Sequence, residues 1–235
     1  MLKKIFAFSL SEVLVVVGII GVVAALTLPN LSHNVEERKC ISALRKIYPE
    51  IENAYQQVVA EYGRPVEWPA AADASSNKMT DYMNEFIQKY FSIIKNCGRN
   101  TQGCFPSYNN VENDTTYSNM LLKNGASLSI LVGGMSAIRS NVNNHGTSAN
   151  DDNFCHGYMG KFIVDVNGPQ GENQPGYDIF EFYMCYDEGL VADGDNPTGP
   201  TATAVSGTAW ALKAGNRDYL KCANQLNWNT KRSCK

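Results

Sequence analysis

Histidine is scarce in this chain of 235 residues, which has only His33, His145 and His156. The sequence also lacks a Gly-x-Ser-x-Gly motif, a Cys-x-x-Cys pair and a phosphate-binding glycine loop. A hydrolase requires a nucleophile with a neighbouring base, and the adjacent Cys155 and His156 do not form such a pair by adjacency alone. The sequence therefore predicts a protein that is not an enzyme.

The chain has no excess of positive charge: it contains 20 Lys and Arg and 23 Asp and Glu, which gives a net charge of −3. Proteins that bind nucleic acid through a broad surface cluster Lys and Arg there, so nucleic acid is not an expected partner. Charged residues are absent altogether from Val13 to Val35, whereas the chain beyond about residue 63 is rich in Asn, Gly, Ser and Thr. This distribution predicts an apolar anchor followed by a soluble domain with many turns.

Cysteine is frequent in the polar part of the chain, which holds six of the seven cysteines. That density favours disulfides and an oxidising compartment. Cys97 and Cys104 enclose a short loop with a glycine and are the first candidates for a pair. The other pairings are not determined by the sequence, and Cys40 is the natural odd cysteine.

The N-terminal segment has the length of a membrane span. The 24 residues from Phe8 to Leu31 would extend about 36 Å as a helix, enough to cross a hydrocarbon core of ~30 Å. Lys3 and Lys4 precede the apolar run with no acid to balance them. By the positive-inside rule they predict a cytoplasmic N-terminus.

Two common kinds of N-terminal segment, a secretory signal peptide and a signal anchor, are the simplest interpretations of this apolar run. A secretory signal peptide has a shorter apolar core with a small-x-small cleavage site after it, but here the apolar run continues past Ala24 and Ala25 to Leu28. A plain signal anchor accounts for the length and for the lysines. Neither accounts for Glu12, because a carboxylate at the edge of an uncharged membrane segment is costly and is functional by default.

Glu12 belongs to a longer pattern, since residues 8–25 read FSLSEVLVVVGIIGVVAA. This segment resembles the prepilin-type N-terminal motif of type IV pilins and type II secretion pseudopilins. In that family a dedicated peptidase cuts before a Phe and methylates the new N-terminus, which implies a cut between Ala7 and Phe8. The family usually has Gly where this chain has Ala7.

The resemblance also implies roles for two residues inside the segment. Glu12 would be the fifth residue of the processed chain, where the glutamate of the family pairs with the N-terminal amine of a neighbouring subunit. Pro29 is the twenty-second residue counted from Phe8, a position where many of these pilins have proline. Because proline removes a backbone donor and bends a helix, a kink is expected at Pro29.

The implied fold is the α+β pilin fold, in which a long N-terminal helix packs its second half against a small antiparallel sheet. The expected organisation is a leader at 1–7, a membrane and filament-core helix at 8–31, an amphipathic stem helix at 32–63 and a head domain at 64–235. The implied location is the bacterial inner membrane, crossed once, with the head in the periplasm or outside the cell. The implied partners are other pilins or pseudopilins, prepilin peptidase, an inner-membrane assembly platform and the lipid bilayer.

Sequence patterns place the elements of the stem and the head. Apolar residues at three- and four-residue steps predict a helix that ends at Tyr62, since Gly63 is a typical C-terminal cap. A second amphipathic helix is expected at about 79–95. Strands are predicted at 127–132, 161–166 and 178–184, with Asn167-Gly168 as a turn signal. Residues 164–180 also resemble the C-terminal sheet region of minor pilins and pseudopilins.

No cofactor is expected, with calcium as the alternative. Asp165, Asn167 and Asp178, with Glu172 and Asn173 between them, supply oxygen ligands around a glycine-rich connection. Their spacing does not match an EF-hand loop, and Asn, Asp and Gly are ordinary turn residues. Turn formation is therefore the favoured interpretation of these residues.

Three functions remain open from the sequence. The first is a pseudopilin of a type II secretion system. The second is a type IV pilin, major or minor, of a surface pilus used for adhesion, motility or DNA uptake, in which case DNA becomes a partner. The third is a membrane-anchored extracytoplasmic domain that binds a ligand and is not assembled into a filament.

Overall fold

A computed structural model of the chain describes residues 9–68, 74–106, 116–144, 155–171, 173–194 and 207–234, without the side chains of residues 28–34. The chain divides into two compact units, Met1–Lys39 and Cys40–Lys235. Helix α1 (Leu10–Tyr62) begins in the first unit and ends in the second. An apolar helix combined with a six-stranded antiparallel sheet confirms the predicted α+β class.

The first unit consists, in its described part, of the apolar beginning of α1. The stretch Leu10–Thr27 is long and apolar enough to cross a membrane by length and composition, although a signal sequence near the N-terminus passes the same test. None of this stretch is buried within the chain. The helix is continuous through Pro29, and the kink expected at that residue stays a prediction.

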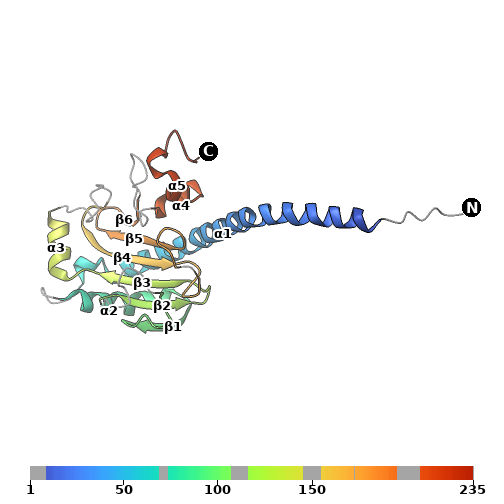
Figure 1. The fold of residues 1–235 in the computed structure, drawn as a ribbon. Helices are drawn as coiled ribbons and strands as arrows, with labels where there is room; N and C mark the ends of the chain where they lie inside the picture. Colours follow the sequence, from blue (N-terminus) through green and yellow to red (C-terminus); the bar gives the residue numbers. More distant parts are fainter. Residues whose placement is uncertain are drawn as a thin grey trace, which may run out of the picture. The chain divides into compact units, whose positions relative to one another are not determined.

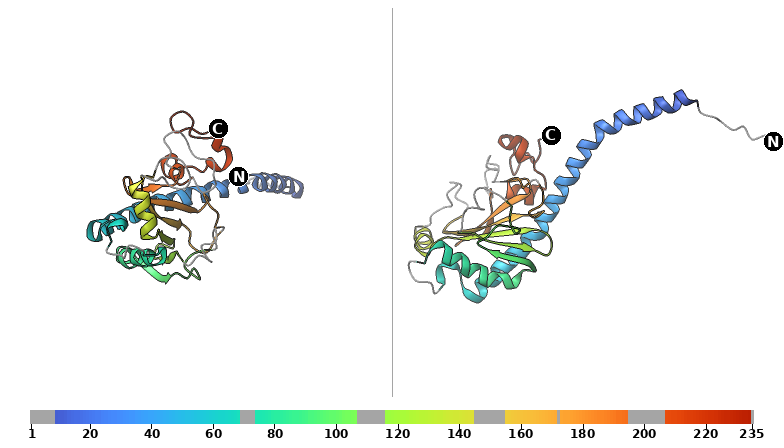
Figure 2. Two further views of the ribbon diagram at one scale, coloured as in Figure 1. Left: turned by 90° about the vertical axis from the view of Figure 1, so that its left-hand side faces the viewer. Right: turned by 60° about the horizontal axis from the view of Figure 1, so that its bottom comes forward.

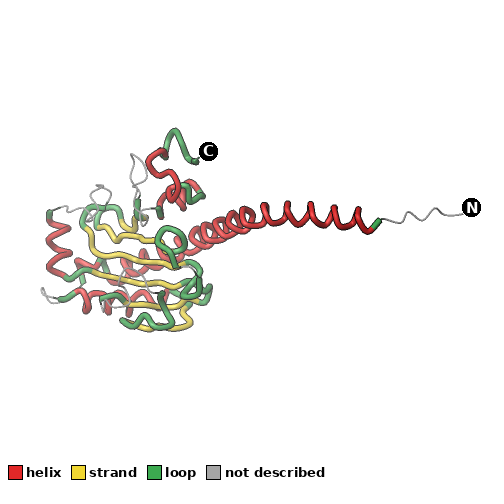
Figure 3. The backbone as a smooth tube through the Cα atoms, in the orientation of Figure 1, coloured by secondary structure: helices red, strands yellow, loops and turns green. Residues whose placement is uncertain are grey.

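The second unit is built on one sheet in which every strand pairs with its neighbours in sequence (Figure 1). All five pairings are antiparallel. The strands are β1 (Ile93–Gly98), β2 (Ser118–Leu122), β3 (Ser127–Val132), β4 (Tyr158–Asp165), β5 (Ile179–Cys185) and β6 (Gly189–Ala192). The helices are α2 (Ser76–Ile87), α3 (Met135–Asn143), α4 (Thr208–Ala214) and α5 (Tyr219–Cys222), and 3-10 turns lie at Pro65–Glu67, Gln88–Tyr90 and Ala223–Gln225. Figure 3 shows the course of these helices and strands along the backbone.

The main core of this unit lies between one face of the sheet and the helices α1 and α2 (Figure 2). Residues of α1 at three- and four-residue steps, such as Leu44, Ile51 and Val58, are 0% exposed. Tyr55 meets Phe162 of β4 edge to face, with ring centroids 6.2 Å apart. Burying each such side chain contributes about 1.5–3 kcal/mol, so the amphipathic pattern of α1 is the main reason for its position on the sheet.

The opposite face of the sheet carries a smaller apolar cluster. Side chains alternate along β4 and β5 because successive residues of a strand point to opposite faces. Ile163 and Ile179 therefore face away from α1 and pack with Phe105 and Tyr117. Phe105 comes directly after Cys104, which ties this cluster to the loop that begins at Cys97.

Several predicted boundaries agree with the structure. Helix α1 ends at Tyr62, and Gly63 follows with φ +78°, the left-handed conformation of a C-terminal glycine cap. The strand predicted at 127–132 is β3. Those predicted at 161–166 and 178–184 correspond to β4 and β5, with β4 starting earlier, at Tyr158.

The second predicted helix was wrong in its last part. Helix α2 ends at Ile87, and residues 93–98 form the edge strand β1 instead of continuing to 95 as a helix. Tyr90, Phe91 and Ile94 fit a helical spacing, but a short apolar run does not distinguish helix from strand. Pairing with β2 provides backbone hydrogen bonds for β1, and that partner is distant in the sequence.

Candidate functional site

The start of α1 is the first candidate site, because it combines an apolar surface with a carboxylate. Ser9 is the residue before the helix, and its backbone N–H donates to Glu12 Oε2 at 2.8 Å. In return the N–H of Glu12 donates to Ser9 Oγ at 3.3 Å. These reciprocal bonds form a capping box, which satisfies two of the backbone donors that a helix leaves open at its N-terminus.

The capping box gives Glu12 a local role that the sequence interpretation missed. The signal was present as Ser9-x-x-Glu12, the spacing that defines a capping box. Lys3, Lys4, Ala7 and Phe8, the residues of the predicted leader and cleavage site, lie outside the described residues. The structure therefore describes the environment of Glu12 and not that of the cleavage site.

Three disulfides brace the second unit. Cys97 is joined to Cys104, Cys155 to Cys185 and Cys222 to Cys234. The first pair is the one that the sequence placed first. The other two pairings depend on which strands and turns come together, which spacing along the chain does not disclose. Cys40 lies outside these three pairs.

The calcium candidates Asp165, Asn167 and Asp178 are brought together at the β4–β5 connection. Asn167 Nδ2 donates to Asp178 Oδ2 at 3.1 Å, and the backbone N–H groups of Asn173 and Gln174 donate to Asp178 at 3.0 and 2.6 Å. Asp165 Oδ1 accepts the N–H groups of Asn167 and Gly168, each at 3.1 Å. These contacts are those of a hydrogen-bonded turn.

Few oxygens in this turn remain open to a cation. Asp165 Oδ2 and Asn173 Oδ1 are buried without a hydrogen-bond partner, whereas calcium takes about six to eight oxygen ligands. Across the described ranges, no group of three or more His, Cys, Asp or Glu side chains is placed to hold a metal ion. Glu172 lies outside these ranges. Burial and the nearby charge of Asp178 raise the pKa of Asp165 to about 8.

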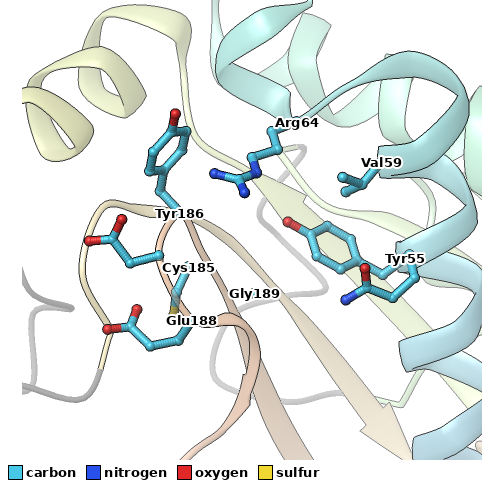
Figure 4. A pocket seen from close by; sticks show the side chains of 9 residues that line it. Tyr55, Val59, Arg64, Cys185, Tyr186, Glu188 and Gly189 are labelled. Atoms are coloured by element: carbon cyan, nitrogen blue, oxygen red, sulfur yellow. The ribbon is translucent and has the colours of Figure 1, made fainter.

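A pocket of about 210 Å³ lies between the end of α1 and the β5–β6 turn (Figure 4). Tyr55 and Val59 of α1 form one wall, Arg64 follows the helix, and Cys185 to Gly189 form the other wall. The guanidinium of Arg64 stacks over the Tyr186 ring, with Arg64 Cζ 4.4 Å from the ring centroid. Apart from Cys185, one of the cysteines expected to form disulfides, no residue of this pocket was selected from the sequence, because its two walls are more than a hundred residues apart.

The rim of the pocket carries a hydrogen-bonded pair, Glu188 and His156. Glu188 accepts the backbone N–H of His156 at 2.9 Å and also contacts His156 Nδ1. The hydrogen bond and the charge of Glu188 raise the pKa of His156 above its usual value. His156 follows Cys155, whose disulfide to Cys185 holds this rim against the pocket wall.

None of the family models, curated proteins or solved structures that were compared with this chain matches it.

Proposed function

We propose that the chain is a structural subunit of a type IV pilus-like filament, specifically a type II secretion pseudopilin that prepilin peptidase processes before Phe8. The observation that carries this proposal is the start of α1, where an apolar stretch with no buried residue is headed by a carboxylate. A type IV pilin, major or minor, is the related alternative that shares these features.

The apolar stretch needs a covering that the chain itself does not provide. Its large apolar side chains are between 49% exposed at Val13 and 80% exposed at Leu10. They lie on all sides of the helix, the pattern of a helix surrounded by lipid or by other helices. A bilayer and a filament core of packed helices both satisfy this requirement.

Glu12 favours the filament over a simple anchor. An ionised carboxylate in an apolar environment requires a positively charged partner, and the described residues around Glu12 offer only the Ser9 cap. Cleavage before Phe8 would create a new N-terminal amine near the cap, and the amine of a neighbouring subunit provides the opposite charge. Assembly through this pair accounts for the charge of Glu12, which the capping box alone does not require, since a Gln at that position completes it equally well.

The second unit supports the same proposal. Its antiparallel sheet is covered on one face by the second half of α1, the arrangement expected of a pilin head. Its three disulfides suit an oxidising compartment outside the cytoplasm. The role assigned to the chain is structural and not catalytic.

A pair of variants separates the assembly role of Glu12 from its capping role. Glu12→Gln removes the charge but keeps an oxygen that accepts the Ser9 N–H. Ser9→Ala removes the capping hydroxyl and keeps the charge. In the native host, Glu12→Gln is expected to reduce sheared filaments at least about tenfold, since a lost buried ion pair costs several kcal/mol, while membrane insertion is retained.

Ser9→Ala is the matched control and is expected to assemble nearly as the wild type. Filaments are counted by electron microscopy, and inserted subunit is measured by immunoblotting of membranes. Normal assembly of Glu12→Gln would contradict the proposal and leave a membrane-anchored binding domain as the better interpretation. If Ser9→Ala failed to assemble filaments while Glu12→Gln assembled normally, Glu12 would matter only as a helix cap.

A further inference from the structure

The pocket between α1 and the β5–β6 turn is lined by a tyrosine hydroxyl that no described residue engages. Tyr55 is only 2% exposed, and its hydroxyl points into the pocket toward Arg64 (Figure 4). Its ring is held by Phe162, with centroids 6.2 Å apart. Burial raises the pKa of this hydroxyl, so it remains a neutral donor across the physiological range. The hydroxyl has no hydrogen-bond partner among the described residues and opens on the pocket, so it is free to donate to an acceptor that enters there.

Arg64 places a second group of donors in the same pocket. Its guanidinium stacks on the ring of Tyr186, and among the described residues it forms no ion pair. Glu188 lines the same pocket, but both of its oxygens form hydrogen bonds to His156 and neither forms one to Arg64. The hydroxyl of Tyr55 and the guanidinium of Arg64 therefore line the same pocket, with the hydroxyl directed toward Arg64 (Figure 4).

The geometry of the donors and the acidic residues of the pocket favour a carboxylate over a phosphate as the ligand. A planar guanidinium matches a carboxylate, which can accept two of its N–H groups in parallel. Asp187 and Glu188 line the same pocket and repel anions, a doubly charged phosphate more strongly than a singly charged carboxylate. A volume of about 210 Å³ accommodates a group the size of one side chain.

We propose that this pocket binds a carboxylate, with Arg64 and Tyr55 as the donors. The wall formed by the β5–β6 turn is held in position without a ligand. The Cys155–Cys185 disulfide joins its first residue to Cys155, and Gly189, at φ +79°, allows the tight turn that ends it. The inference does not depend on the filament role, since all the residues concerned lie in the second unit. The carboxylate can come from an acidic side chain or from a chain terminus.

Three nearly isosteric probes test the proposal on the full-length chain in detergent micelles. N-acetylglutamic acid α-amide carries a side-chain carboxylate, N-acetylglutamine carries a chain-terminal carboxylate, and N-acetylglutamine amide carries none. Binding is followed by NMR through the Arg64 Nε–H signal and the Gly189 amide signal. At least one of the two acids is expected to shift both signals saturably at millimolar concentration, and the uncharged amide is expected to shift neither.

Two variants assign the effect to the named donors. Tyr55→Phe removes only the hydroxyl and is expected to weaken binding about 5-fold, the worth of one neutral hydrogen bond. Arg64→Gln, followed through Gly189, is expected to abolish saturation. Arg139→Gln removes an exposed arginine of α3 outside the pocket and is expected to bind as the wild type does.

The stronger of the two acids identifies the source of the carboxylate, and either result supports the proposal. Absence of saturation for both acids at tens of millimolar would overturn it. Equal binding by the wild type, Tyr55→Phe and Arg64→Gln would also overturn it. Because the measurement uses single subunits in micelles, neither result depends on whether the chain assembles into filaments.

Discussion

Asp165 is buried beside a second carboxylate, Asp178, in the β4–β5 turn, which makes its protonation part of the stability of the fold. Burial and the charge of Asp178 raise its pKa to about 8, whereas an Asp in an unfolded chain titrates near ~3.9. The folded chain therefore keeps a proton that the unfolded chain releases. The stability linked to this proton is fully present below about pH 4 and is lost as the pH rises toward 8.

Asp165→Asn is expected to remove most of this pH dependence. The amide keeps an oxygen for the N–H groups of Asn167 and Gly168 and replaces Oδ2, which has no partner, with a donor that faces Asp178. The free energy of unfolding at pH 8, measured by urea titration, is expected to rise by on the order of 2 kcal/mol relative to the wild type, with a smaller change at pH 5.

Asp178→Asn is the matched control for that measurement. Both oxygens of Asp178 accept N–H groups, so an amide nitrogen there would face other donors. This variant is expected to lose stability at every pH. If Asp165→Asn lost stability between pH 5 and pH 8 as steeply as the wild type, the assignment of the pH dependence to Asp165 would be wrong.

At the scale of elements, the Cys97–Cys104 loop connects the edge strand β1 to the outer face of the sheet. The loop ends in Phe105, which is 4% exposed and packs on Ile163 and Ile179. Replacing both cysteines by Ser is expected to lower the free energy of unfolding by about 2 kcal/mol, the loop-entropy value for a disulfide with this short separation.

The coupling between the disulfide and Phe105 is tested by a double-mutant cycle with Phe105→Ala. If the disulfide positions Phe105, the combined variant loses less stability than the sum of the two separate losses. The free energies are measured by denaturant titration under non-reducing conditions. Additive losses would show that Phe105 holds its position without the disulfide.

At the scale of the whole molecule, the two units differ in how their apolar side chains are covered. Cys40–Lys235 has its own core and its own disulfides. The stretch Leu10–Thr27 of the first unit has no residue buried within the chain and is long and apolar enough to cross a membrane. Under the proposed function, the fate of the molecule in the cell depends on whether its N-terminus is cleaved before Phe8.

Intact mass of the membrane-extracted chain from its native host, with N-terminal fragmentation, determines that processing. Under the proposed function the chain begins at Phe8 and carries one additional methyl group. A chain that begins at Met1 would indicate that Ala7 blocks the cut and would favour an anchored domain. A chain cleaved after Ala24 or Ala25 would be a secreted protein, and the filament proposal would be abandoned.

Features that depend on neighbouring residues in the sequence were predictable from it. The apolar N-terminal helix, the end of α1 before Gly63 and the strand β3 follow from runs, spacings and caps that are local to each segment. The Ser9–Glu12 capping box was equally local, although the sequence interpretation did not use it.

Features that join distant segments were decided only by the tertiary structure. The edge strand β1 exists because β2 pairs with it, and Cys155 meets Cys185 because β5 returns beside β4. The carboxylate pocket likewise requires Tyr55 of α1 to face Tyr186 of the β5–β6 turn. Periodicity along a chain reports which face of an element is apolar. The partner that covers that face, and the polar groups that become buried with it, depend on residues far away in sequence.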